Sequence, residues 1–150
     1  MNERSVSSPQ IGESQTAAWA LALPPRELKH GLVSKCCVGI PCRYQGNGFL
    51  RGFLQKVGLE HDFIAVCPEQ LGGLPTPREG CNVRHGRVLG RQTGFDFTEP
   101  YQAGARQSLE ICRRNDITTA YLLKNSPSCG KAYGLTAKFL EEHGIKVVPV

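Results

Sequence analysis

Three cysteines, Cys36, Cys67 and Cys129, each stand at the end of an apolar, strand-like run, although they lie far apart in the chain. In an open parallel sheet the carboxyl ends of the strands border the ligand-binding crevice. We therefore expect the three thiols to converge at one edge of a sheet, a geometry that suits a metal centre. Three thiolates can hold three irons of a 4Fe-4S cluster and leave one iron unligated by the protein, free to bind a substrate.

A simpler interpretation is that each thiol is a small buried hydrophobic group, because free cysteine is among the most buried residue types. The position of all three at strand ends favours a site. Cys37 and Cys112 are expected in the core, since successive strand side chains alternate between faces and since Cys112 lies on the apolar face of a helix. Cys42 and Cys81 lie in loops, from which either could approach the site.

A carboxylate follows the second cysteine closely, because Glu69 stands two residues after Cys67 and directly after Pro68. The rigid proline limits the backbone, so we expect the carboxylate to stay near any metal that this thiol holds. There Glu69 could act catalytically, as a general acid or base. The alternative is an exposed loop glutamate with no role in chemistry.

Two hydroxyl groups precede the third cysteine, because Ser126 and Ser128 flank Pro127 just ahead of Cys129. Either serine could act in a catalytic site by orienting substrate or water, while Gly130 lets the backbone pass close to a cluster. The alternative is an ordinary turn, for which Ser-Pro-Ser is common chemistry. The spacing does not decide between these interpretations.

The composition is that of one globular domain. The chain has 150 residues, of which 40% are hydrophobic and 21% charged, so it can bury a core without disulfides or a structural metal. No apolar run approaches the roughly 18 residues of a membrane-spanning helix, and the polar N-terminus does not resemble a secretory signal. We expect a cytoplasmic protein without membrane association, in which all seven cysteines stay reduced.

The net charge of +5 is modest, and the basic residues are scattered or in short pairs. This pattern indicates an ordinary soluble surface, and the alternative is a surface that attracts nucleic acid or anionic nucleotides. No Rossmann or Walker A glycine pattern follows a strand, so the sequence gives little support to a nucleotide cofactor.

The chain divides into an arm and a domain. Residues 1–29 are predicted to be an N-terminal arm, flexible or loosely docked, because Ser, Gln and Glu dominate its start and Pro24-Pro25 stops its short apolar run. Residues 30–150 are predicted to form one domain of alternating strands and helices. Strands are expected at 31–37, 62–66, 117–123 and 145–150, helices at 49–57, 98–114 (with Thr98 as N-cap) and 135–143, and a hairpin within 82–93.

This alternation predicts the fold class. Strands joined by right-handed helical crossovers form a parallel sheet with helices packed on its faces. We therefore expect an α/β fold with three layers, in which a mainly parallel sheet is flanked by helices in a Rossmann-like or flavodoxin-like arrangement, as a single domain.

Several motifs, taken together and in order, resemble the thiouracil desulfidase family over residues 31–150. The resemblance is carried by Val33-Ser34-Lys35-Cys36, Cys42-Arg43-Tyr44, Cys67-Pro68-Glu69, Gly72-Gly73-Leu74-Pro75-Thr76-Pro77-Arg78, Gly104-Ala105 and Ser126-Pro127-Ser128-Cys129-Gly130. It implies a cytosolic enzyme that binds a 4Fe-4S cluster through Cys36, Cys67 and Cys129. It also implies roles for Glu69 and Ser126 near the substrate.

The activity that the resemblance implies is the removal of sulfur from thiolated pyrimidines, of the 2-thiouracil or 4-thiouracil type, without net redox change. Our hypothesis is that the thiocarbonyl sulfur binds the open iron while water, aided by Glu69, attacks the ring carbon and Ser126 orients the base. A soft sulfur substrate suits thiolate-held iron. One alternative is the same chemistry on thiolated tRNA uridine, and another is a non-catalytic sensor that binds zinc or a cluster.

Overall fold

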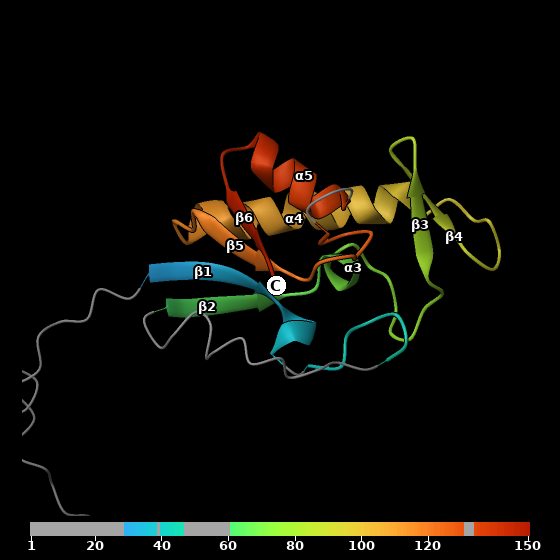
Figure 1. The fold of residues 1–150 in the computed structure, drawn as a ribbon, viewed down its shortest axis with the longest axis horizontal. Coiled ribbons are helices and arrows are strands. Elements are labelled where there is room, and N and C mark those ends of the chain that lie inside the picture. Colours follow the sequence, from blue (N-terminus) through green and yellow to red (C-terminus); the bar gives the residue numbers. More distant parts are fainter. Residues whose placement is uncertain (1–28, 39, 47–60, 131–133) are drawn as a thin grey trace, which may run out of the picture.

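The computed structural model describes residues 29–38, 40–46, 61–130 and 134–150. Its centre is a four-stranded sheet with the order β2-β1-β5-β6, in which every neighbouring pair is parallel (Figure 1). The strands are β1 (Lys29–Ser34), β2 (His61–Val66), β5 (Thr119–Leu122) and β6 (Lys146–Pro149). The predicted fold class, a parallel sheet flanked by helices in one small domain, is confirmed.

Two helices cover one face of this sheet, α4 (Thr98–Arg114) and α5 (Leu135–Glu142), and they pack against each other (Figure 1). The predicted apolar face of α4 is buried, including Leu109 and Cys112, which join Leu32 of β1 in the main core. Val33, the next residue of β1, belongs to a second buried cluster, because successive strand side chains face opposite ways. The helix expected at 49–57 lies outside the described residues.

A short hairpin stands apart from the sheet, formed by β3 (Cys81–Arg84) and β4 (Arg87–Gly90) (Figure 1). His85 and Gly86 make the turn with φ values of 49° and 75°. Positive φ at both central residues is the backbone of a type I′ turn, which matches the twist of a two-stranded hairpin. The hairpin predicted within residues 82–93 is thus confirmed.

The first strand is shorter than predicted. It ends at Ser34, and residues Lys35–Cys37 form a turn of 3-10 helix, η1. The reason is that the ladders on both sides stop here, since Ser34 pairs with the last residue of β2 and Val33 with Tyr121 of β5. The Ser34 hydroxyl then accepts a hydrogen bond from the Leu123 backbone at 3.0 Å. Cys36 and Cys37 therefore do not alternate along a strand, although both are buried.

The start of α4 also differs from the prediction by one residue. Phe97 is the N-cap and Thr98 is the first helical residue. The Asp96 carboxylate accepts a hydrogen bond from the Thr98 backbone N–H at 2.9 Å, while the Thr98 hydroxyl accepts one from the Val88 backbone. The Thr98 hydroxyl also donates to the Asp96 carboxylate, and this bond, together with the one from the Thr98 backbone and the contact with Arg87, lowers the pKa of Asp96 to about 2. None of the helices in the described ranges is long and apolar enough to cross a membrane.

A four-residue helix, α3 (Pro68–Leu71), follows β2 and packs against α4 at very short range. A side chain at Gly104 of α4 would overlap the Pro68 carbonyl, and one at Gly72 would overlap the Pro100 carbonyl. The missing side chains at both positions let the two backbones touch. This contact fixes the segment that follows Cys67.

Replacing Gly104 by alanine is expected to lower the free energy of unfolding by about 1–3 kcal/mol, the usual cost of overpacking. In an open helix the same change would raise stability by up to about 1 kcal/mol, because alanine is the better helix former. Here the clashing atom is backbone of α3, which cannot rotate away. Denaturant unfolding measures the difference. Gln107→Ala, on the exposed side of α4, is the control and should stay within about 0.5 kcal/mol of wild type. A Gly104→Ala protein as stable as wild type would contradict the close contact.

Candidate metal centre

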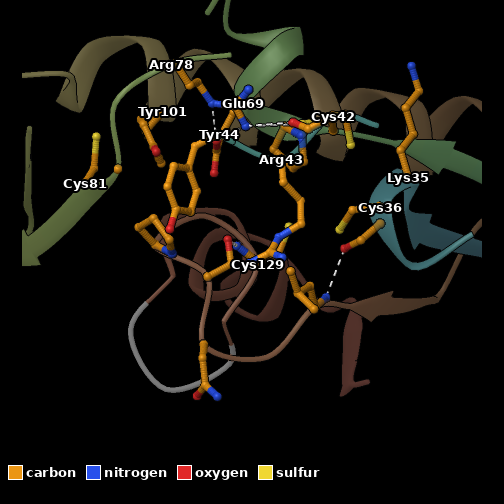
Figure 2. A pocket seen from close by; sticks show the side chains of 18 of the residues that line it. Lys35, Cys36, Cys42, Arg43, Tyr44, Glu69, Arg78, Cys81, Tyr101 and Cys129 are labelled. Carbon is orange, nitrogen blue, oxygen red and sulfur yellow. Dashed lines mark hydrogen bonds and ion pairs between the residues drawn. The ribbon is translucent and has the colours of Figure 1, made fainter. Parts of the chain in front are cut away.

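A cavity of about 400 Å³ opens at the carboxyl ends of β1, β2 and β5 (Figure 2). In the sheet, β2 lies on one side of β1, whereas β5 and then β6 lie on its other side. The direction in which strands are added to the sheet therefore reverses between β1 and β5. This is the position at which open α/β sheets bind their ligands. The cavity therefore lies where the sequence predicts a site.

All three predicted thiols line this cavity. Cys36 comes from η1, Cys67 directly follows β2, and Cys129 lies in the loop after β5. Their exposed fractions are 5%, 8% and 6%, respectively. The structure thus brings together, at one edge of the sheet, three residues from distant parts of the chain.

The thiols influence one another's ionisation. Burial raises the pKa of Cys129 well above its usual range, and the nearby Glu69, Cys36 and Cys67 add to the effect. A hydrogen bond with Cys37, together with burial, raises the pKa of Cys36 to about 12. In the metal-free protein these thiols are protonated at neutral pH, so a bound metal must displace their protons.

Cys42 joins this group, which the sequence left open. Its side chain is 2% exposed, and the nearby Cys36 thiol, together with burial, raises the pKa of Cys42. The Cys67 thiol also donates to the Cys42 carbonyl oxygen at 3.7 Å. Cys81 lines the opposite part of the cavity, where its thiol contacts Tyr101. Cys112 lies in the main core, as predicted.

The donor set fits an iron–sulfur cluster better than a single ion. Within the described ranges, no three His, Cys, Asp or Glu side chains stand close enough together to bind one metal ion. A 4Fe-4S cluster makes a different demand, because its cysteine thiolates bind separate iron atoms. Three buried thiols spread around one cavity, with no local zinc-binding spacing, meet that demand. Cys36, Cys67 and Cys129 could therefore hold such a cluster.

Glu69 is buried at the same cavity, with 8% of its surface exposed, so the alternative of an exposed loop glutamate is wrong. It lies in the first turn of α3, directly after Pro68 at the helix start. Its carboxylate pairs with the Arg78 guanidinium, which comes from the loop after α3 (Figure 2). A buried carboxylate held beside three thiols can exchange protons with whatever occupies the cavity.

Ser126 and Ser128 have different positions. Ser126 lines the cavity, and its hydroxyl oxygen accepts hydrogen bonds from the backbone N–H groups of Ser128 and Cys129, at 3.2 and 3.1 Å. Ser126 thus makes the expected turn and also faces the site. The Ser128 hydroxyl is not at the cavity wall, because it bonds the Thr136 hydroxyl at 2.9 Å, beneath the start of α5.

Basic side chains make the cavity electropositive, and sequence reasoning assigned none of them to the site. Lys35, Arg43, Arg78, Arg91 and Lys124 all contribute to its walls. Arg43 extends into the cavity beside the thiols (Figure 2). Clustered positive charge favours anionic occupants, including a cluster carried on thiolates.

The comparisons with known proteins agree with this geometry. Residues 32–149 match the 2-thiouracil desulfurase family. The chain is 33% identical over 140 residues to YbbK of Bacillus subtilis (strain 168), an uncharacterised protein, with 78% of this chain and 93% of YbbK covered.

A solved structure is also similar. It is that of TudS, a 4Fe-4S-dependent thiouracil desulfidase, which superposes with a TM-score of 0.74 at 33% identity and covers 81% of this chain and 90% of its own. The resemblance seen in the sequence motifs is thereby confirmed. With its thiol-lined cavity at the switch point of a parallel sheet, this chain belongs to the 2-thiouracil desulfurase family.

Proposed function

We propose that this protein is an enzyme that removes sulfur from thiolated pyrimidine bases, of the 2-thiouracil or 4-thiouracil type, with a 4Fe-4S cluster as its cofactor. The reaction is a hydrolysis without net redox change, in which the thiocarbonyl and water become a carbonyl and hydrogen sulfide. The observation that carries the proposal is the meeting of three buried thiols and a buried carboxylate in one cavity. Membership of the 2-thiouracil desulfurase family supports it.

Cys36, Cys67 and Cys129 hold the cluster in this proposal. With three protein ligands, the cluster supplies one open iron, a soft Lewis acid suited to a thiocarbonyl sulfur. The thiols and the carboxylate that line the cavity are buried, and electrostatic interactions with a bound base are stronger in such surroundings than at an exposed surface.

Glu69 is proposed as the catalytic acid–base group. Its carboxylate takes a proton from the water that attacks the ring carbon, and then returns a proton to the departing sulfur or the ring nitrogen. Because Glu69 lies in α3 and its carboxylate is paired with Arg78, the side chain is held in one conformation at the cavity. General acid–base catalysis of this kind is worth about 10²–10⁴-fold in rate.

The two serines have separate proposed roles. The Ser126 hydroxyl oxygen already accepts two backbone N–H groups, so its own proton is free to be donated to a base in the cavity. Ser128 is proposed to support catalysis indirectly, because its hydrogen bond to Thr136 fixes the loop that carries Cys129.

We also place the enzyme in the cytoplasm, whose reducing conditions keep buried thiols available as ligands.

A turnover assay tests the proposal and its alternatives. Cluster-loaded protein is incubated without oxygen with free 2-thiouracil, free 4-thiouracil or thiolated tRNA, and released sulfide and the loss of thiocarbonyl absorbance are measured. The free bases are expected to be converted to uracil with one sulfide per base. Sulfide release from tRNA alone would favour the thiolated tRNA uridine alternative, for which the basic cavity wall is the supporting feature. A cluster-bearing protein that releases no sulfide from any of the three would favour the sensor.

A further inference from the structure

The Arg78 guanidinium forms polar contacts with several separate segments of the site. Its Nε and Nη2 atoms contact the Glu69 carboxylate of α3, and Nη2 also donates to the Cys42 carbonyl oxygen at 2.9 Å. Nη1 donates to the Thr76 hydroxyl at 3.0 Å and to the Pro75 carbonyl at 3.2 Å, within its own loop. One guanidinium therefore joins the segments that carry Glu69 and Cys42 (Figure 2).

The burial of this group makes the arrangement rigid. The side chains of Arg78 and Glu69 are only 7% and 10% exposed. A buried guanidinium is tolerated only when its donors are matched, because charge removed from water is costly to leave unpaired. Here acceptors come from four residues, set around a planar group with fixed donor directions. A lysine ammonium carries the same charge but cannot reach acceptors in this fork-like pattern.

The contact with the neighbouring thiol is much weaker. Nη2 lies 4.0 Å from Cys67 Sγ, at the outer limit of a hydrogen bond to sulfur. The close contacts are those with the carboxylate and the backbone carbonyl. Any influence of Arg78 on the reaction should therefore pass mainly through Glu69.

We propose that Arg78 is a positioning residue for the desulfuration reaction, whose guanidinium holds the Glu69 carboxylate in its productive orientation against the cavity. This inference rests on the proposed function. In this role Arg78 acts through Glu69 and not as a ligand of the cluster. Its effect is to keep the proton-transfer group in place, where an error of about 1 Å can cost about 10²-fold in rate.

The test combines Arg78→Lys with Glu69→Gln in a double-mutant cycle on the cluster-loaded protein. Arg78→Lys is expected to lower kcat by about 10²-fold, with KM and the iron and sulfide content close to wild type. In the Glu69→Gln background the same change should cost less than about twofold, because residues that act as a unit are not additive. Arg87→Lys is the matched control and should leave kcat unchanged, since Arg87 is an exposed residue of the hairpin that pairs with Asp96 just before α4.

A second readout uses no turnover. In the metal-free protein, Arg78→Gln and Glu69→Gln should each lower the denaturant midpoint, and the double variant should be no less stable than the worse single variant, because the unpaired buried charge is then gone. The corresponding cycle at Arg87 and Asp96 should be much closer to additive, because exposed pairs couple only weakly. Additive losses at Arg78 and Glu69 would overturn the buried pairing on which the inference depends.

The kinetic outcomes separate this inference from the proposed function. An Arg78→Lys enzyme with wild-type kcat, or one equally impaired with and without Glu69, would overturn the positioning role while the wild-type enzyme still released sulfide. A cluster-loaded wild-type protein that releases no sulfide would overturn the proposed function, and the role of Arg78 would fall with it.

Discussion

Replacing Glu69 by glutamine is expected to lower kcat for sulfide release by about 10²–10⁴-fold, the contribution of a positioned acid–base group. Glutamine keeps the size and hydrogen-bonding oxygen of the side chain but can neither accept nor return the proton. KM should change little, because the carboxylate is proposed to act on water and the leaving group. Steady-state kinetics on cluster-loaded protein measures both constants.

Stability must be followed in the same variant. Glu69→Gln leaves the buried Arg78 guanidinium without its counter-charge, and breaking a buried pair in this way costs about 3–5 kcal/mol. Rates are therefore compared at a temperature where the folded fraction, measured by circular dichroism, matches wild type. A folded, cluster-bearing Glu69→Gln enzyme with wild-type kcat would remove Glu69 from the mechanism.

The second large effect is expected at a thiol. Cys67→Ala removes one of the three proposed ligands and should abolish both cluster retention and turnover, because only two of the proposed thiolates would then remain. Iron, acid-labile sulfide and visible absorbance report the cluster, and sulfide release reports turnover. Both should be lost together.

Cys112→Ala is the matched control for this thiol. Cys112 is fully buried, but it lies between α4 and the sheet and not at the cavity. Its loss should cost about 0.5–3 kcal/mol of stability, as core substitutions usually do, and leave the iron content unchanged. Equal iron content in Cys67→Ala and Cys112→Ala would show that Cys67 is not a ligand.

The sequence predicts the frame of this site well because the frame depends on local pattern. Alternating strands and helices imply a parallel sheet, and a cysteine at the end of each strand implies thiols at one edge. The same reasoning finds α4, where Leu109 and Cys112 fall on one helical face. It overextends β1, because the end of that strand is set by where its pairing ends, at Val66 of β2 and at Tyr121 of β5.

The roles of the residues that complete the site depend on tertiary contacts, although Cys42 and Arg78 both stand in motifs that carry the family resemblance. Cys42 is one loop thiol among several until η1 and its loop fold it between Cys36 and Cys67. Arg78 is an ordinary loop arginine until α3 turns back against α4 and buries it beside Glu69. Turn chemistry alone does not separate Ser126 from Ser128, and it is the bond of Ser128 to Thr136 at the start of α5 that places Ser128 away from the cavity.

Metal and sulfide analysis of protein purified without oxygen tests most directly whether Cys36, Cys67 and Cys129 carry an iron–sulfur cluster. The expected result is about four irons and about four acid-labile sulfides per chain, with a broad visible absorbance that Cys67→Ala lacks. A protein that carries zinc, or that carries no metal and no labile sulfide under these conditions, would contradict the assignment.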